Sequence, residues 1–374
     1  MLVKSISLGN YRNYRELQIG FHPNLNIFVG GNGQGKTNIL EAVFYAATGK
    51  SHRTNYDGEL ISWEDKFLRI VLKGERSCGN INIEMLVRSD GKKILKVNNQ
   101  LKKKLSELIG TINVVLFSPE DMLLVKGGPS IRRRFLDIEI SQTSPFYCHN
   151  LANYNRVVTQ RNNLLKAVRE QKEKIELMDV WDLQLVEFGV NIIKKRTEVL
   201  DKISPIARSI HKKITEGAEE LNLAYVPSVD IQKAEEDSTP QEYFMRKLKE
   251  IRNTEIIKGV TLIGPHRDDI DIKIGDTSIK TFGSQGQQRT CALSMKLSEV
   301  EFMKNETGEY PVLLLDDVMS ELDEGRRRFL LEVVNGKVQT FVTSTGIQEV
   351  WAPVKEKSRI FEVKAGKILL VQEG

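Results

Sequence analysis

The sequence predicts an α/β fold, with a mixed sheet, an antiparallel β layer and a second lobe made of helices. Three observations indicate this. Short apolar runs of strand length stand near both ends of the chain, and alternating apolar and polar segments after the first of them are typical of paired strands. The middle of the chain instead carries apolar residues three or four apart, as helices do.

Length and composition narrow the class of protein. The chain has 374 residues, which at roughly 150 residues per domain suggests two or three lobes. Hydrophobic residues make up 40% and charged residues 28%, so the chain can bury a sizeable core and is not disordered as a whole. Lys and Arg total 55 against 50 Asp and Glu, a formal charge of +5, which is compatible with nucleic acid but does not by itself indicate it.

No apolar run approaches the roughly 20 residues that a membrane-spanning helix needs, which argues against a membrane transporter in one chain. The alternation at the N-terminus predicts a strand rather than a signal peptide. The cysteines, Cys78, Cys148 and Cys291, lie far apart without a CxxC pair, so neither a disulfide framework nor a zinc site is predicted. We therefore expect a cytoplasmic protein.

The first hundred residues predict strands around one helix. Apolar residues alternate over residues 2–8, and the apolar run 25–29 ends at the Gly-rich segment GGNGQGKT. The next residues, NILEAVFYAATG, predict a helix closed by Gly49. Between residues 67 and 98, alternating segments flank an Asp-Gly pair that is typical of a tight hairpin, which predicts the antiparallel β layer.

From about residue 145 to 217 the spacing predicts at least two helices, too short and too irregular in heptad phase for an extended coiled coil. The polar stretch 232–242 predicts a surface loop. After Val260 the apolar runs VTLIG, VLLLDD and VQTFVT alternate with helical segments, as in an α/β core. We expect residues 1–143 and 258–374 to form the two parts of one lobe and residues 144–257 to form the helical lobe.

The clearest chemical motif is GGNGQGKT, which fits GxxxxGK[ST]. Its glycines permit backbone angles at which successive N–H groups turn inward around phosphate oxygens, and the following helix points its positive end at them. The lysine would reach the β- and γ-phosphates, and the threonine hydroxyl would bind Mg²⁺. A coincidental Gly-rich turn is the alternative, which the strand before and the helix after disfavour. The predicted phosphate-binding residues are Gly30, Gly31, Asn32, Gly33, Gln34, Gly35, Lys36 and Thr37.

A second motif is the apolar run VLLL followed by Asp316 and Asp317. A buried strand would deliver Asp316 beside Mg²⁺ at the carboxyl edge of the sheet, where open α/β sheets bind ligands. Asp317 would then face the attacking water as general base. A strand end with solvated acids is the alternative. The predicted catalytic residues are Lys36, Asp316 and Asp317, and the predicted metal ligands are Thr37 and Asp316.

The third motif, SQGQQR, precedes a helical run. Ser284, Gln285 and Gly286 would form an anion site at a helix N-terminus. Because the P-loop already holds the phosphates from one side, this site would face the γ-phosphate of a nucleotide held by another subunit. An N-cap followed by polar helix residues is the alternative. The SELD segment that ends at Asp323 follows the acidic pair and could be a simple loop and N-cap.

Two further features leave alternatives open. Four basic clusters could contact DNA phosphates or could be solvated faces, and the Arg134 region beside Asp137 could be an internal ion-pair network. The segment GPHRDD, residues 264–269, pairs acids with a histidine, but no other His or Glu stands at metal-ligand spacing. The clusters are residues 102–104, 132–134, 194–196 and 326–328.

The order of P-loop, SQGQQ signature, LLLDD strand and SELD loop resembles the ABC-type ATPase heads of the SMC and Rad50 group. Most closely, the sequence resembles the RecF family of bacterial recombination and gap-repair proteins, which also lack a long coiled coil between the two ATPase halves. The segments that carry this resemblance span nearly the whole chain. They are NYRNY, GGNGQGKTNILEA, FSPEDMLLVKGGPSIRRRFLD, TLIGPHRDD, FGSQGQQR and LLLDDVMSELD.

The resemblance implies an ATP-dependent homodimer with two nucleotides held between the P-loop residues of one copy and the signature of the other, where Ser284 and Gly286 complete the site and Asp323 lies at the dimer seam. It implies ATP and Mg²⁺ as cofactors. It implies double-stranded or gapped DNA as partner and leaves single-stranded DNA open. It also implies that the chain works with RecR and RecO to load RecA at gaps and to support the SOS response.

Two departures from the wider ABC pattern predict slow hydrolysis. Asp317 stands where many relatives have glutamate, and residues 343–345 stand where many have a switch histidine. We expect a weak, DNA-stimulated ATPase that times a clamp rather than driving a motor. The glutamine of the usual Q-loop is not assigned, and the FSPED segment is the expected place. The alternative function is an ATPase subunit of a larger DNA-processing or transport complex.

Overall fold

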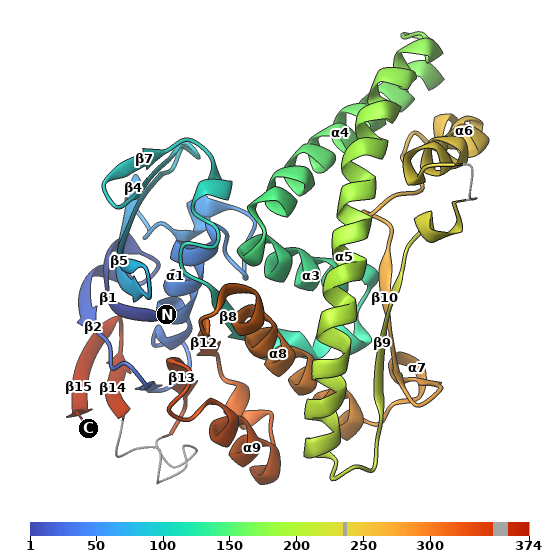
Figure 1. Ribbon diagram of the computed structural model, residues 1–374. Helices are drawn as coiled ribbons and strands as arrows, with labels where there is room; N and C mark the ends of the chain where they lie inside the picture. Colours follow the sequence, from blue (N-terminus) through green and yellow to red (C-terminus); the bar gives the residue numbers. More distant parts are fainter. Residues whose placement is uncertain (235–237, 347–357, 374) are drawn as a thin grey trace. The chain divides into compact units, whose positions relative to one another are not determined.

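A computed structural model describes residues 1–234, 238–346 and 358–373 (Figure 1). The chain divides into two compact units. Unit 1 combines Met1–Met122 with Ala292–Gly374, and unit 2 is Leu123–Cys291. The borders between these units differ from the domain limits expected from the sequence, at 143/144 and 257/258. Those domain limits stay a prediction. In the part of the chain that the structure describes, no helix is both long and apolar enough to cross a membrane.

Unit 1 contains a mixed sheet that joins the two ends of the chain. Its strand order is β15-β14-β3-β13-β12-β8, in which only the pair β14 and β15 is antiparallel. The carboxyl ends of β3, β12 and β8 therefore lie at one edge of the sheet. The strands are β3 (Leu25–Val29), β8 (Val114–Phe117), β12 (Val312–Leu315), β13 (Thr340–Ser344), β14 (Ser358–Lys364) and β15 (Lys367–Glu373).

The expected antiparallel layer is confirmed as a second sheet of unit 1, with the order β2-β1-β4-β5-β6-β7. The hairpin that the Asp-Gly pair predicts joins β5 to β6, and Gly91 adopts a φ of 81° in its turn. The strands are β1 (Leu2–Tyr11), β2 (Tyr14–Gly20), β4 (Phe67–Arg76), β5 (Gly79–Arg88), β6 (Lys93–Val97) and β7 (Gln100–Lys102).

Helix α1 (Lys36–Thr48) contacts β4 and β5 of the antiparallel sheet and β8 and β13 of the mixed sheet. A helix covered on all sides must be apolar all round, which explains why every residue after Asn38 is buried. The one charge in that stretch, Glu41, accepts hydrogen bonds from Arg12 at 2.9 Å and from the Ser51 hydroxyl at 2.6 Å. Gly49 ends the helix in the left-handed conformation, as predicted.

The remaining helical elements of unit 1 are short, except for α8, which begins in unit 2. They are η1 (Asp57–Leu60), η2 (Leu105–Glu107), η3 (Pro119–Met122), α8 (Gln285–Thr307), η6 (Val318–Ser320) and α9 (Glu324–Val334).

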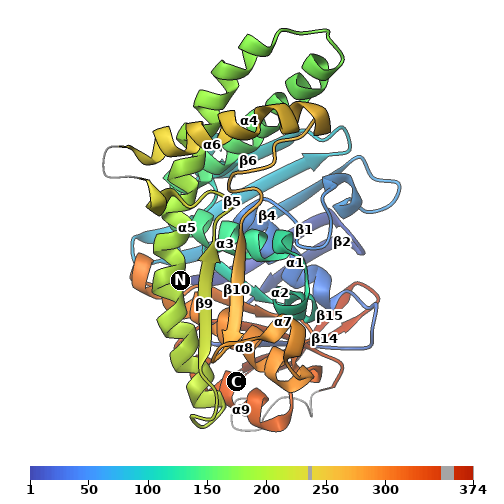
Figure 2. The ribbon, with the colours of Figure 1, turned by 90° about the vertical axis from the view of Figure 1, so that its right-hand side faces the viewer.

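Unit 2 is mostly helical, as expected, and α5 is its longest helix, packing against α4, α6 and β9 (Figure 2). A sheet in the order β11-β10-β9 completes the unit. Its elements are α2 (Leu123–Lys126), α3 (Pro129–Thr143), α4 (Pro145–Arg169), η4 (Ile175–Leu177), α5 (Met178–Ile214), β9 (Leu221–Val226), η5 (Ile231–Lys233), α6 (Pro240–Lys258), β10 (Asp269–Ile274), β11 (Thr277–Ser278) and α7 (Ile279–Phe282).

Two local predictions are wrong in this unit. The polar stretch 232–242 is only partly a loop, because its last residues begin α6: Thr239 caps the helix, Pro240 is its first residue, and Glu242 completes a capping box. Residues 235–237 lie outside the described residues. The run VTLIG forms no strand, because side chains bind its backbone N–H groups: the N–H of Thr261 donates to Asn162 Oδ1 at 2.7 Å and that of Leu262 to Glu255 Oε1 at 2.7 Å.

Candidate nucleotide site

The P-loop, residues 30–37, connects β3 to α1 at the carboxyl edge of the mixed sheet. Gly33 and Gly35 have φ values of 75° and 116°, which side chains with a Cβ disfavour. A Cβ at Gly30 would lie 2.3 Å from the carbonyl oxygen of Val363, so no larger residue fits there. The Lys36 ammonium lies across the loop and donates to the carbonyl oxygens of Gly30 at 2.6 Å and Gly31 at 2.9 Å.

Two hairpin turns hold the loop from outside. In the turn between β1 and β2, the Asn13 amide donates to the carbonyl oxygen of Gln34 at 2.9 Å and the Tyr14 hydroxyl to that of Gly35 at 3.0 Å. In the turn between β14 and β15, the N–H of Gly366 donates to the same Gln34 carbonyl at 3.1 Å. These contacts give the NYRNY segment a structural role that sequence reasoning had missed, because the partners stand far apart in the chain.

The structure brings the P-loop and the acidic strand end together. Asp316 directly follows β12, and the Thr37 hydroxyl donates to its Oδ1 at 2.9 Å. A second hydroxyl, that of Thr343, donates to the same oxygen at 2.9 Å. Burial raises the pKa of Asp316 above its ordinary value, while the hydroxyls of Thr343 and Thr37 act in the opposite direction.

The oxygen donors at this point fit Mg²⁺. A carboxylate and a threonine hydroxyl side by side are hard ligands of the kind that Mg²⁺ prefers, and Mg²⁺ is usually held by one or two protein groups together with phosphate oxygens and water. Among the described residues no cluster of three or more His, Cys, Asp and Glu could hold a metal ion by itself. Thr37 and Asp316 are thus a partial set of ligands that a bound triphosphate would complete.

Asp317 differs from its neighbour in backbone and in burial. It is half-buried and adopts the left-handed conformation, with φ 55° and ψ 20°, at the start of η6. Its N–H donates to the Thr343 hydroxyl oxygen at 2.8 Å. In the sequence, Thr343 stands out only as part of a segment that lacks the switch histidine. Its contacts with both acids were not predicted.

The signature lies in unit 2, at the start of α8. The Ser284 hydroxyl accepts from the N–H of Gln287 at 3.2 Å, and the Gln287 side chain accepts from the N–H of Ser284 at 2.9 Å. Ser284 therefore caps the helix, and Gln285 and Gly286 form its first turn. This is the geometry of the alternative, an N-cap followed by polar helix residues. The predicted anion site at the same helix end stays a prediction.

Asp323 also caps a helix. Its carboxylate accepts from the N–H of Arg326, the first cause of the lowered pKa of Asp323, and an ion pair with the Arg326 side chain strengthens the cap. The alternative given for the SELD segment, a loop followed by an N-cap, therefore describes its geometry.

Two of the basic clusters supply side chains to the interior of unit 2. Arg132 is buried and forms a bidentate pair with Asp269, at 2.6 and 2.9 Å. Arg196 is buried against Asp137 at 2.8 Å and donates to the carbonyl oxygen of Pro265 at 2.6 Å. The alternative of an internal ion-pair network, raised for the Arg134 region, thus holds for Arg132, and Arg196 of another cluster is internal in the same way. Neither Arg132 nor Arg196 can reach a DNA backbone in this fold.

The GPHRDD segment belongs to the same network. Tyr154 OH lies 2.7 Å from His266 Nδ1, and His266 Nε2 lies 3.1 Å from the carbonyl oxygen of Thr261. Because a carbonyl only accepts, Nε2 carries the proton of the neutral ring. Burial lowers the pKa of His266 to about 4. Asp268 accepts from the N–H of Ser228 at 2.6 Å. These contacts are structural, and they hold the histidine and the acid inside the fold rather than presenting them to a substrate as a nuclease would.

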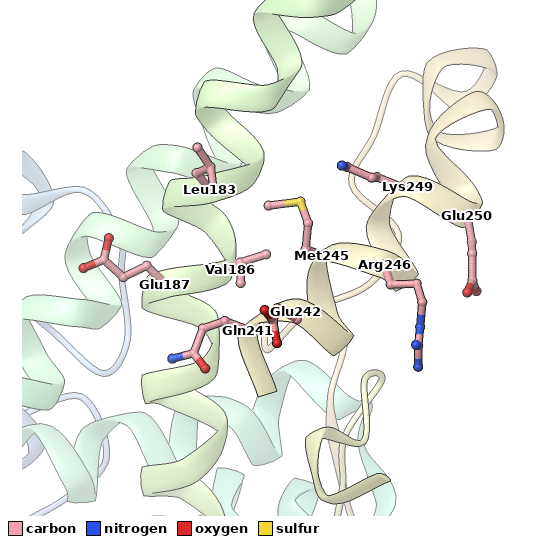
Figure 3. Close-up of a pocket in the computed structure, with 9 residues that line it drawn as sticks. All are labelled: Leu183, Val186, Glu187, Gln241, Glu242, Met245, Arg246, Lys249 and Glu250. Carbon is pink, nitrogen blue, oxygen red and sulfur yellow. The ribbon is translucent and has the colours of Figure 1, made fainter. Parts of the chain in front are cut away.

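An apolar groove of about 650 Å³ lies elsewhere in unit 2, between α5 and α6 (Figure 3). Leu183, Val186 and Met245 provide its apolar surface, with charged side chains of both signs around them. It contains no residue of the P-loop, the acidic pair or the signature, so it is separate from the candidate nucleotide site.

The parallel strands, the P-loop between β3 and α1, and an acidic strand end hydrogen-bonded to the P-loop threonine together define an ABC-type ATPase head. A family model described as RecF/RecN/SMC N terminal domain matches residues 2–368. The DNA replication and repair protein RecF of Bacillus cytotoxicus is 44% identical over 368 residues, 98% of each chain. The protein of the same name in Bacillus cereus is 44% identical over 369 residues, also 98% of each chain.

Solved structures support the same family. The recombination mediator protein RecF of the RecFOR pathway, in a structure described as RecF-ATP, superposes with a TM-score of 0.91 and 33% identity, covering 99% of this chain and 98% of that chain. An SMC head bound to the C-winged helix domain of ScpA shares the fold alone, with a TM-score of 0.56 and 16% identity. The chain belongs to the RecF family.

Proposed function

We propose that this protein is an ATP-dependent DNA-binding protein of recombinational gap repair and replication restart, in which ATP closes a homodimer over DNA and slow hydrolysis reopens it. The observation that carries the proposal is the 2.9 Å hydrogen bond between Thr37 Oγ1 and Asp316 Oδ1. It joins two motifs that lie far apart in the sequence into one site with the donors that a nucleotide and Mg²⁺ require.

The chain's own residues divide the work on the nucleotide. Lys36 and the N–H groups of the P-loop bind the phosphates, and Thr37 and Asp316 hold Mg²⁺, which neutralises charge on the phosphates when bound. Asp317 accepts a proton from the attacking water. A carboxylate one methylene shorter than glutamate reaches less far, and this supports a weak ATPase. We propose that DNA stimulates this activity and that its role is regulatory.

The second half of the site comes from another copy of the chain in this proposal. Ser284, Gln285 and Gly286 of one copy bind the γ-phosphate held by the other, and Asp323 lies near the seam. The position of these residues at the N-terminus of α8, where the helix dipole favours negative charge, supports an anion site of this kind. A ligand shared by two subunits stabilises only the dimer, so ATP sets how long the clamp stays on DNA.

The relatives' names support the wider role. RecF proteins are named for DNA replication and repair and for the RecFOR pathway. By that likeness we propose that this chain binds double-stranded and gapped DNA in the cytoplasm, works with RecR and RecO, promotes RecA loading, and supports SOS induction. A subunit of a larger DNA-processing or transport ATPase is the alternative.

Size-exclusion chromatography with light scattering, with and without ATP, Mg²⁺ and gapped duplex, tests the clamp. We expect nucleotide-dependent dimers for the wild type, and dimers that no longer turn over ATP for Lys36→Arg. Ser284→Arg should spare ATP binding by the monomer and abolish the dimer, whereas equal loss of both would show that the signature acts on its own copy. The proposal fails if ATP changes neither the oligomeric state nor the affinity for DNA across a salt series.

A further inference from the structure

We propose that Thr343 is a positioning residue of the nucleotide site, whose single hydroxyl fixes both the Mg²⁺-binding carboxylate of Asp316 and the backbone of Asp317. The inference deepens the proposed function and rests on it, since it concerns how the same site acquires its affinity for the metal. Thr343 is fully buried in β13, and the sequence predicts no role for it beyond its place in the run VQTFVT and in the segment that lacks the switch histidine.

The hydrogen bonds at Thr343 run in one direction. The N–H of Asp317 can only donate, so the hydroxyl oxygen of Thr343 accepts from it at 2.8 Å. The hydroxyl carries one proton, and this proton is directed to Oδ1 of Asp316 at 2.9 Å. The two functional acids are thus connected through one side chain, and neither can shift without breaking a bond to it.

The sheet makes this position rigid. Strand β13 is flanked by β12 on one side and β3 on the other, with Val342 opposite Leu315 and Thr343 opposite Phe28. The residue after Val342 therefore lies beside the residue after Leu315, which is Asp316. Because both neighbouring strands fix β13, the Thr343 hydroxyl has a defined place relative to the P-loop that follows β3.

Thr37 and Thr343 donate to the same oxygen of Asp316, but their roles differ. The Thr37 hydroxyl would bind Mg²⁺ through its oxygen while its proton can still point to Asp316, so Thr37 would be a metal ligand itself. The oxygen of Thr343 instead accepts from the N–H of Asp317, which leaves Thr343 the role of a partner of the carboxylate. Thr343 therefore keeps Oδ1 of Asp316 oriented with and without the metal, as the partners behind a metal ligand do in other metal sites.

Thr343 also stabilises the left-handed backbone conformation of Asp317. A non-glycine residue in this conformation is unfavourable by itself and persists when surrounding contacts over-determine it. The N–H bond to Thr343 is one such contact, and the Ser320 hydroxyl, which donates to the carbonyl oxygen of Asp317 at 2.8 Å, is another. Loss of the first should misplace the carboxylate of Asp317 as well as that of Asp316.

The test compares Thr343→Val, which keeps the shape and removes the hydroxyl, with Thr343→Ser, which restores it. The matched control is Thr340→Val, in the same strand, where the buried hydroxyl donates only to the carbonyl oxygen of Val338 at 3.0 Å. Affinity for a fluorescent ATP analogue is measured with EDTA and across a Mg²⁺ titration, together with thermal unfolding and single-turnover hydrolysis of ATP.

We expect Thr343→Val to raise the Mg²⁺ concentration for half-maximal binding about tenfold, the usual effect of losing a buried hydrogen bond to a charged group. Affinity in EDTA should change less than about twofold, since the P-loop is intact, and hydrolysis should fall tenfold or more. Thr343→Ser should recover most of the Mg²⁺ affinity and most of the hydrolysis rate. Thr340→Val should keep the wild-type Mg²⁺ dependence.

If Thr343→Val does not fold, Thr343→Cys, which retains the volume with a much weaker donor and acceptor, gives the same comparison. Equal Mg²⁺ dependence in Thr343→Val and Thr340→Val, with a wild type that binds ATP, overturns the inference alone. A wild type that binds no nucleotide overturns the proposed function and the inference with it.

Discussion

Asp316 and Asp317 are adjacent in sequence, but the fold gives them different chemistry. Asp316 is buried and accepts from two hydroxyl groups, which suits a fixed metal ligand. Asp317 is half-buried and turned out of the strand by its left-handed backbone, which suits contact with water. A strand alone cannot give two successive residues these orientations, and the change of backbone after Asp316 does.

We expect Asp317→Asn to slow ATP hydrolysis by at least about 100-fold, the usual contribution of a general base, while leaving ATP binding within about twofold. If hydrolysis opens the dimer on DNA, as proposed, this dimer should then persist longer. Hydrolysis of radiolabelled ATP and light scattering measure the two effects. The control is Asp201→Asn on the exposed side of α5, and equal losses in both variants would contradict the role given to Asp317.

His266 should make stability depend on pH. An unfolded histidine titrates near 6.5, whereas burial lowers the pKa of His266 to about 4. Between these values the unfolded chain binds a proton that the folded protein does not. The free energy of unfolding should therefore fall as the pH drops from about 6.5 to 4, by up to about 3 kcal/mol, and should be unaffected above this range.

Urea unfolding of the wild type and of His266→Gln at several pH values between 4.5 and 7.5 measures this effect. Glutamine can keep a donor toward the Thr261 carbonyl and does not titrate. We expect the wild type to be the more stable at pH 7.5 and its advantage to shrink as the pH falls. A difference that stays constant with pH would show that His266 does not contribute.

At the scale of elements, Arg161 connects four parts of unit 2. From α4 its guanidinium donates to Asp182 of α5 at 2.7 Å, to Glu255 of α6 at 2.6 Å and to the Thr261 hydroxyl at 2.9 Å. Arg161, Asp182 and Glu255 are all fully buried. Removing one partner of such a cluster leaves a buried charge without its counter-charge. This lowers the free energy of unfolding by far more than the whole cluster raises it.

We therefore expect Arg161→Met to lower the free energy of unfolding by about 3–5 kcal/mol. The triple variant that also carries Asp182→Leu and Glu255→Leu should recover part of this loss, because both buried carboxylates are gone and Arg252, which also pairs with Asp182, keeps its pair with Asp179. Urea denaturation followed by circular dichroism measures both. Lys247→Met, which breaks the exposed pair with Glu250, should change stability by less than about 1 kcal/mol. A loss of stability in Arg161→Met as small as that in Lys247→Met would contradict the role given to Arg161.

At the scale of the whole molecule, the proposed sharing of ATP between two copies has a thermodynamic consequence. If the nucleotide stabilises only the dimer, the midpoint of thermal unfolding in ATP and Mg²⁺ must rise with protein concentration. The same protein without nucleotide should show no such dependence. Scanning calorimetry or fluorimetry over a hundredfold range of concentration measures this. A concentration-independent rise with ATP would indicate binding to one copy alone.

The site could be predicted from the sequence wherever contiguous residues set the geometry. The P-loop needs only glycines in series, a lysine, a threonine and a helix, so the sequence alone is enough to assign residues 30–37. Gly49, the Asp-Gly hairpin and the apolar strand before Asp316 are local in the same way. The role of Thr343 could not be predicted in this way, because it depends on the register of β13 against β12.

The sequence by itself determined the family, the α/β fold with a helical second lobe and the place of the P-loop between a strand and a helix, since backbone conformation and hydrophobic periodicity act over short stretches of chain. The tertiary structure alone decided which charges are internal: it buried Arg132 and Arg196, made the GPHRDD segment part of a polar network, and kept VTLIG out of a sheet. The physical reason is that burial and hydrogen-bond partners depend on residues distant in sequence, which no local pattern records.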